Sequence, residues 1–370
     1  MWPIDPANKP IADGQLPETD ATLEVYTWPG HVSQRCLSDF SKAYRCTVRR
    51  TNFTTIVEAL RTLIHGRDRF DVFMGVPTDV IGLLVSRSLI RPLNHSYIPN
   101  ISQAWPVFTD PYYDSHWLYT VPYTVFTTGI AWRKDMVDLD PYALANGWTF
   151  PWVAKSRGRT AILADYRESI GLGLLKIGVR DLNTTDPLLI DDARQALLDL
   201  TGLVSLRINN TTSRQIASGR SWVHHARSGQ AVAAARYLPP GVPVDVIGYW
   251  FPPTGAGPVA NDTNTVLRRA QNPVLAHLFL SFMLDRTNVM HNVAATGYTQ
   301  PLTYVTPARL VSEGVLPASL TSAAVVSTYF DRGLKKFEIP AAADLLWRQA
   351  WHAVNHRALA RSNRRRPLRG

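Results

Sequence analysis

Apolar and polar residues alternate with two different periods over the first hundred residues of the chain. Between residues 21 and 27, the apolar Leu23 and Val25 alternate with polar neighbours, which is the period of a half-buried strand. Residues 31–44 instead carry apolar side chains at helical spacing and predict an amphipathic helix. The same two periods then recur, predicting strands at 47–51 and 70–74 and helices at 55–65 and 78–86. This alternation is typical of a mostly parallel sheet covered by helices.

A second series of elements surrounds residues 141–151, which are rich in Pro, Gly and Trp. Before this stretch the pattern predicts two strands, at 117–123 and 127–132. After it we expect strands at 159–163, 221–225 and 244–247, and helices at 166–177, 190–205, 212–218, 229–237, 273–284, 287–295 and 341–354. Two α/β series with the chain returning between them indicate two lobes joined by crossing strands, with a ligand cleft at the carboxyl ends of the strands.

The expected fold class is therefore α/β with two lobes. The crossings set the expected boundaries: a leader at 1–20, a first lobe at 21–128 and 263–308, and a second lobe at 129–262 and 309–356. The remaining residues, 357–370, hold six arginines and no acidic residue. We interpret them as a solvated, disordered tail rather than a contact for an anionic membrane or nucleic acid; no aromatic residues lie between the arginines and no nucleic-acid fold is recognisable.

Composition limits the class of protein further. With 370 residues, 45% of them apolar and 18% charged, the chain has the composition of a soluble globular protein. The tail arginines account for six of the net +10 charges, which leaves +4 on the rest. Residues 1–20 lack the apolar segment of a signal peptide. An export signal outside this sequence, a misassigned start and a cytoplasmic protein all remain open.

The cysteines and histidines do not form a metal-binding pattern. His224 and His225 are neighbours on a predicted strand, so their side chains point to opposite faces and do not share one ion. Cys36 and Cys46 are too few for a disulfide framework, and two buried thiols are favoured over a single bridge. We therefore expect no metal and no cofactor.

Several longer segments, in their order along the chain, resemble the spermidine/putrescine-binding proteins of bacterial ABC importers. The resemblance runs from about Leu23 to about Trp351. The segments that carry it are LEVYTWPGHV, FDVFMGV, LYTVPYTVFTTGIAWRKDMV, GRTAILADYRE, NTTDPLLIDDARQALLDL, VDVIGYWFPPTGAGPVANDT and FLSFMLDRTNVMHNVAATGYTQPL.

This resemblance implies a fold, a function and partners. The fold would be a type II periplasmic-binding-protein fold, with two mixed sheets, flanking helices and a ligand cleft at the hinge. The function would be to bind a polyamine such as putrescine or spermidine, or a related cationic amine, outside the cytoplasm and deliver it to the permease subunits in the membrane. Neither nucleic acid nor enzymatic activity is implied, and such proteins are monomers by default.

The resemblance also implies which residues contact the ligand. A polyamine needs carboxylates to accept hydrogen bonds from its ammonium groups and aromatic walls for its methylene chain and for cation–π attraction. Carried over position by position, the candidate ligand-binding residues are Trp28, His31, Asp165, Glu168, Arg227, Asp262 and Tyr298. Of these, His31 replaces a common tyrosine and Arg227 an aromatic residue.

Other expected positions depart from the pattern of the family. A serine or tyrosine after the third strand falls on Val76 and Thr78, and a tryptophan falls on Ala260. A glutamine near the C-terminus falls near Phe337. Most of the expected carboxylates are therefore present, whereas half of the aromatic residues expected to line the ligand site are replaced.

Each candidate also has a purely structural interpretation. Asp165 and Glu168 fit a capping box, in which Asp165 accepts the N–H of Glu168 and Glu168 reaches back to the start of the helix. Trp28 would pack at the hinge, and Tyr298 would contact the end of the preceding helix. Asp262 lies among residues that favour turns.

Two other functions remain open from the sequence. The same fold could serve as a cytoplasmic enzyme of specialised metabolism, with His31, Asp165 and Glu168 as acid/base groups. Alternatively, Arg227 would recognise an anionic or zwitterionic solute of an importer.

Overall fold

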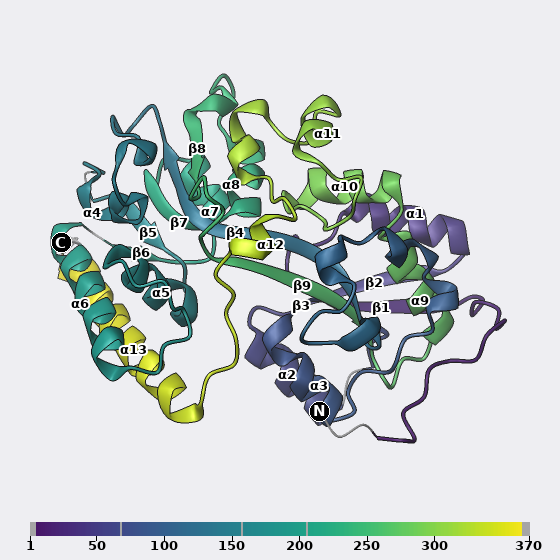
Figure 1. Cartoon of the computed structure of the whole chain (residues 1–370). Coiled ribbons are helices and arrows are strands. Elements are labelled where there is room, and N and C mark those ends of the chain that lie inside the picture. The colour runs from purple at the N-terminus through teal and green to yellow at the C-terminus, as the bar shows by residue number, and fades with distance from the viewer. Residues whose placement is uncertain (1–4, 67–68, 157, 205, 365–370) are drawn as a thin grey trace, which may run out of the picture. The chain divides into compact units, whose positions relative to one another are not determined.

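The computed structural model describes residues 5–66, 69–156, 158–204 and 206–364 (Figure 1). The chain divides into two compact units: Met1–Val125 with Asn261–Val315, and Phe126–Ala260 with Leu316–Gly370. The chain thus passes between the units after residues 125, 260 and 315, instead of after 128, 262 and 308 as the sequence suggests. One consequence is that Asp262 belongs to the first unit.

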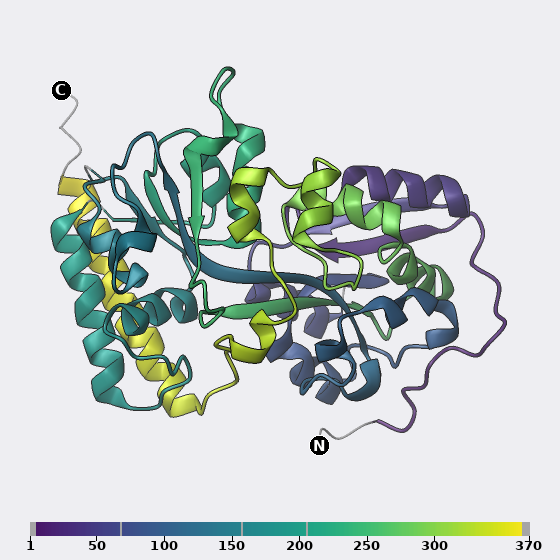
Figure 2. The same ribbon diagram turned by 45° about the horizontal axis from the view of Figure 1, so that its top comes forward.

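The first unit is built on a sheet with the strand order β2-β1-β3-β9. The strands β1 (Thr22–Thr27), β2 (Thr47–Asn52) and β3 (Val72–Pro77) are parallel, and β9 (Val259–Val266) is antiparallel to β3. Helix α1 (Gln34–Tyr44) lies on one face of these strands, and α2 (Ile56–His65) and α3 (Ile81–Ser86) lie on the other (Figures 1 and 2). The unit is completed by α9 (Pro273–Phe282), α10 (Arg286–Thr296) and α11 (Pro307–Ser312).

These elements begin and end where local chemistry directs. The hydroxyl of Thr55 accepts the N–H of Glu58 at 3.1 Å, which caps the start of α2. Gly66 ends α2 with φ at +62°, a conformation that favours glycine. The predicted alternation of strands and helices in this region is therefore the one observed.

Strand β9 is the longest strand that sequence reasoning missed. Its sequence, VANDTNTV, includes two asparagines and an aspartate, which favour turns, yet nearly the whole strand is buried. Two of its polar side chains find partners in distant segments: Asn261 donates to the Tyr113 hydroxyl at 2.9 Å, and Asn264 accepts the N–H of Gly75 at 3.1 Å. Because these partners lie more than a hundred residues away, local composition was the wrong guide.

The second unit is built on strands in the order β4-β7-β5-β6, with β8 also pairing with β4. The strands are β4 (Thr120–Arg133), β5 (Thr160–Ile162), β6 (Arg207–Ile208), β7 (Val223–Arg227) and β8 (Ile247–Trp250). The helices are α4 (Phe150–Val153), α5 (Tyr166–Lys176), α6 (Pro187–Leu203), α7 (Thr212–Ala217), α8 (Ser228–Ala234), α12 (Tyr329–Arg332) and α13 (Ala341–Arg364). Helices α6 and α13 lie side by side in both views (Figures 1 and 2).

Three predictions for these elements were wrong in detail. The two strands predicted at 117–123 and 127–132 are the single strand β4, which passes from the first unit into the second. The strand predicted at 244–247 is mainly a 3₁₀ turn that precedes β8. Helix α13 extends to Arg364, so the first part of the predicted tail is helical. It is held by Arg361, which donates to the carbonyls of Thr201 and Gly202. Residues 365–370 lie outside the described part.

Both cysteines are free thiols, Cys36 buried and Cys46 half-buried. Burial raises the pKa of the Cys36 thiol to about 11. Among the described residues, no helix is long and apolar enough to cross a membrane. The same residues contain no cluster of three or more metal-ligating side chains.

The core of the second unit forms around Trp347 of α13, which is fully buried. Its indole N–H donates to the carbonyl of Thr184 at 3.1 Å, and the guanidinium of Arg167 lies 4.8 Å from the ring centre. The side chain thus combines apolar burial with a satisfied polar atom.

We expect Trp347→Ala to lower the free energy of unfolding by about 3–5 kcal/mol, because it leaves a cavity in the core and an unsatisfied carbonyl. Leu345→Ala, on an exposed position of the same helix, should change it by less than about 0.5 kcal/mol. Urea unfolding followed by circular dichroism measures both. Equal effects of the two substitutions would contradict the placement of Trp347.

Candidate functional site

Trp28 follows β1 at the edge of the first unit. Its indole N–H donates to the carbonyl of Gly75 at 2.7 Å, and its ring centre lies 4.4 Å from that of Phe53. The side chain is half-buried, so one edge packs against the core of the unit while part of the ring stays accessible. Trp28 therefore has a fixed orientation and an exposed surface, as an aromatic wall needs.

His31 lies next to Trp28 and contacts two other candidate residues, Tyr298 and Asp262, as well as Tyr123. Its ring contacts Tyr123 and Tyr298 edge-on, with centroid distances of 5.5 and 5.4 Å. Its Nε2 atom is buried and lies 3.4 Å from Oδ2 of Asp262. The Tyr123 hydroxyl in turn donates to the His31 carbonyl at 2.5 Å, which holds this segment in place.

Gly75 makes this arrangement possible. The strand bulges between Met74 and Val76, and Gly75 has φ at +70°. A Cβ atom at this position would lie 2.6 Å from the His31 ring and 2.8 Å from the Trp28 ring. Both the backbone conformation and the space therefore require glycine.

Four carboxylate side chains are buried in the described part of the chain, and three of them are well satisfied. Asp71 accepts backbone N–H groups at 2.6 to 2.9 Å, and Asp114 accepts N–H and hydroxyl groups at distances down to 2.7 Å. Glu168 is paired with an ammonium group at 2.6 Å. Asp262 is the exception.

The side-chain contacts of Asp262 are both long. The hydroxyl of Thr124 and Nε2 of His31 each lie 3.4 Å from Oδ2. In the described part of the first unit, no lysine or arginine lies within ion-pair distance of this carboxylate. A buried carboxylate is costly unless strong donors compensate it, so Asp262 retains capacity for a cationic partner.

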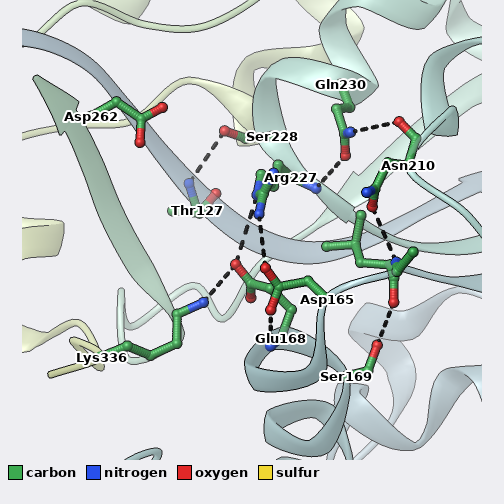
Figure 3. A network of polar contacts seen from close by, with 12 residues as sticks. Thr127, Asp165, Glu168, Ser169, Asn210, Arg227, Ser228, Gln230, Asp262 and Lys336 are labelled. Carbon is green, nitrogen blue, oxygen red and sulfur yellow. Dashed lines mark hydrogen bonds and ion pairs between the residues drawn. The ribbon is translucent and has the colours of Figure 1, made fainter. Parts of the chain in front are cut away.

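In the second unit, Asp165 caps the start of α5. Its carboxylate accepts the N–H of Glu168 at 3.0 Å, which is the first half of the predicted capping box. The side chain of Glu168 does not complete the box. It is paired instead with Lys336 at 2.6 Å and lies 3.7 Å from Nε of Arg227 (Figure 3).

Arg227 is the last residue of β7 and lies between the two carboxylates (Figure 3). Its Nη2 atom is 3.7 Å from Asp165, and its guanidinium lies 5.2 Å from the centre of the Phe126 ring. The side-chain oxygen of Gln230 accepts the backbone N–H of Arg227 at 3.1 Å. This hydrogen bond fixes the backbone of Arg227 at the end of β7.

These cations determine the ionisation of Glu168. Burial by itself would raise the pKa of this carboxyl group, but the ammonium of Lys336 and the guanidinium of Arg227 outweigh it and lower the pKa to about 2. Glu168 is therefore ionised at neutral pH.

The structure sorts the seven predicted residues into two groups, one in each unit. The first unit brings together Trp28, His31, Asp262 and Tyr298, and the second brings together Asp165, Glu168 and Arg227. Sequence reasoning missed Tyr123, whose apolar strand resembles a core segment. It also missed Lys336, which lies in an irregular segment one residue from the expected glutamine position. The one signal for Lys336 in the sequence was indirect: the two predicted carboxylates, Asp165 and Glu168, need cations to balance their charge.

Comparisons with known proteins show the family of this chain. The sequence model of the bacterial extracellular solute-binding proteins matches residues 36–315, and the chain belongs to this family. A putrescine/cadaverine-binding protein of Pseudomonas aeruginosa is 24% identical over 312 residues, which cover 81% of this chain and 86% of that protein. A spermidine/putrescine-binding periplasmic protein of Haemophilus influenzae is 25% identical, covering 75% of this chain and 74% of its own.

Solved structures confirm the predicted fold. The spermidine/putrescine transporter substrate-binding protein PotD of Streptococcus pneumoniae superimposes with a TM-score of 0.74 at 19% identity, over 91% of this chain and 99% of its own. The α/β, two-lobed binding-protein fold predicted from the sequence is therefore correct.

We expect Gly75→Ala to lower the free energy of unfolding more than Gly14→Ala does, because only at Gly75 would the new methyl group clash with neighbouring side chains. Gly14 also has a positive φ, but nothing lies within 4 Å of its Cβ position, so Gly14→Ala should cost only about 1–2 kcal/mol. Gly75→Ala should cost about 1–3 kcal/mol more, because Trp28 and His31 must move. Chemical unfolding compares the two variants. A smaller loss for Gly75→Ala than for Gly14→Ala would contradict the described packing.

The pairing of Glu168 predicts a pH dependence of stability. Its folded pKa, about 2, lies below the ordinary value of 4.5, so its contribution is fully present above pH 4.5 and is lost as the pH falls toward 2. Glu168→Gln should therefore flatten the stability curve between these values. Glu338→Gln removes the same charge from an exposed position and should keep the wild-type slope. Thermal melting from pH 5 to pH 2 makes the comparison, and parallel curves for wild type and Glu168→Gln would contradict the pairing.

Proposed function

We propose that this chain is the solute-binding subunit of an ABC importer and that it captures a small organic amine, a polyamine or a related compound, outside the cytoplasm. Its family and its curated relatives support the proposal, because the relatives are binding proteins for putrescine, cadaverine and spermidine and match three quarters or more of the chain. The partners would then be the permease subunits in the membrane.

One observation supports an amine as the ligand: Asp262 is the least compensated of the four buried carboxylates in the described part. An ammonium group can donate the short, charge-assisted hydrogen bonds that this carboxylate lacks. The accessible rings of Trp28 and Tyr298 add apolar walls for the carbon chain. Each cation–π contact contributes about 0.5–2 kcal/mol.

The alternative of an enzyme receives less support from the site. A general acid or base works best with a pKa near the working pH. Glu168 is held at a pKa of about 2 by its two cations, which suits a permanent ion pair better than proton transfer. Asp165 is engaged as the cap of α5. Two of the three proposed acid/base groups therefore have structural duties.

Isothermal titration calorimetry of the full chain with putrescine, cadaverine, spermidine, butylamine, 4-aminobutyrate and 5-aminopentanoate tests the proposal. At least one of these amines should bind. Asp262→Asn should weaken that binding by about 10- to 100-fold, the loss of one hydrogen bond to a charged group.

The matched control is Asp20→Asn, which removes the same charge from an exposed position of the first unit. It should leave the affinity within about twofold of the wild type, less than 0.5 kcal/mol. The proposal is refuted if no amine of the panel binds, or if Asp262→Asn binds as tightly as the control.

A further inference from the structure

The charged cluster of the second unit has no net charge. It comprises the carboxylates of Asp165 and Glu168 and the cations of Arg227 and Lys336 (Figure 3). In the resemblance to polyamine-binding proteins, the two carboxylates stand where ammonium groups of the ligand are held. Here both already have cationic partners from the chain itself.

Lys336 stands where the resemblance would place an ammonium group of the ligand. Its Nζ atom lies 2.6 Å from Oε1 of Glu168, the distance of a strong charge-assisted hydrogen bond. A second ammonium group, brought by a diamine, would have to displace Nζ from this contact. It would also come close to the guanidinium of Arg227, and like charges in a partly buried site repel strongly.

The exposure of these side chains points in the same direction. The side chain of Glu168 is 3% exposed, whereas those of Lys336 and Arg227 are 20% and 29% exposed. A solute therefore meets the two cations before it meets the buried carboxylate. Asp165 is more exposed, but its carboxylate caps α5 and lies beside Arg227.

The two cations are suited to an anionic group. A guanidinium has five N–H donors in a planar fork and an ammonium has three, so each can serve a carboxylate in addition to its partner within the cluster. The position of Arg227 is set by its backbone hydrogen bond to Gln230 and by its contact with the Phe126 ring. This pre-organisation lowers the cost of binding.

We propose that the solute carries a carboxylate group, which Arg227 and Lys336 receive. This inference rests on the proposed function, in which Asp262 receives an ammonium group. The solute class that follows is amino acids, which carry an amine and a carboxylate, rather than diamines or triamines.

Matched ligands of equal length test this class by calorimetry on the full chain: 4-aminobutyrate against putrescine, and 5-aminopentanoate against cadaverine. In the wild type, the amino acid of each pair should bind at least about 10-fold more tightly than the diamine, the effect of one hydrogen bond to a charged group. Lys336→Met should reverse this order, because it removes a donor for the carboxylate and frees Glu168 for an ammonium group.

Lys335→Met is the matched control, since it removes the same charge from the neighbouring residue and should keep the wild-type preference. If Lys336→Met unfolds because Glu168 loses its partner, the double variant Glu168→Gln with Lys336→Gln removes both members of the pair. This variant should lose the preference for the amino acid without gaining affinity for the diamine. Thermal melting verifies that each variant is folded.

The outcomes separate the two proposals. The wild type could instead bind diamines more tightly than amino acids, with this binding weakened by Asp262→Asn. That result would leave the proposed function standing but overturn the proposal that the solute carries a carboxylate. If folded Lys336→Met still preferred amino acids over diamines, the carboxylate proposal would be overturned as well. No binding of any amine would refute the proposed function itself.

Discussion

The compensation of buried carboxylates is the constraint on which the functional interpretation of this protein depends. Removing a carboxylate from water costs several kcal/mol unless donors replace the lost hydration. Asp71 and Asp114 meet this cost with backbone and hydroxyl donors, and Glu168 meets it with Lys336. Asp262 meets it only partly within the described part of the chain. Asp262 is thus the one buried carboxylate of the described part that lacks short contacts, and it lies beside His31, whose ring contacts Tyr298.

The first unit places Asp262 by burying a strand of polar residues. Along β9, Asn261 and Asn264 have partners of their own, whereas the carboxylate of Asp262 makes no short side-chain contact. The same strand fixes the bulge at Gly75, because Asn264 accepts the N–H of that glycine. The bulge then provides the space for Trp28 and His31. Sheet register and the geometry of the candidate site are therefore coupled in this unit.

The second unit shows why residue type alone does not transfer a binding specificity. Asp165 and Glu168 are the residues that a polyamine-binding protein would be expected to have, and both are acidic here as well. Their surroundings differ, because Arg227 and Lys336 supply the positive charges that a polyamine would bring. The local electrostatics, rather than the presence of the acids, decides which charge a solute can carry.

Periodicity and local chemistry in the sequence determined the α/β class, most of the helices and strands, and the capping role of Asp165. These features depend on residues only a few positions apart, which a sequence displays directly. The resemblance in segment order identified the family and the seven candidate residues. Tertiary structure alone decided that β9 is a strand, that Asp262 belongs to the first unit and that Lys336 neutralises Glu168. The physical reason is the same in each case: the partners are more than a hundred residues apart, and both burial and charge compensation depend on distances in space that local sequence patterns do not encode.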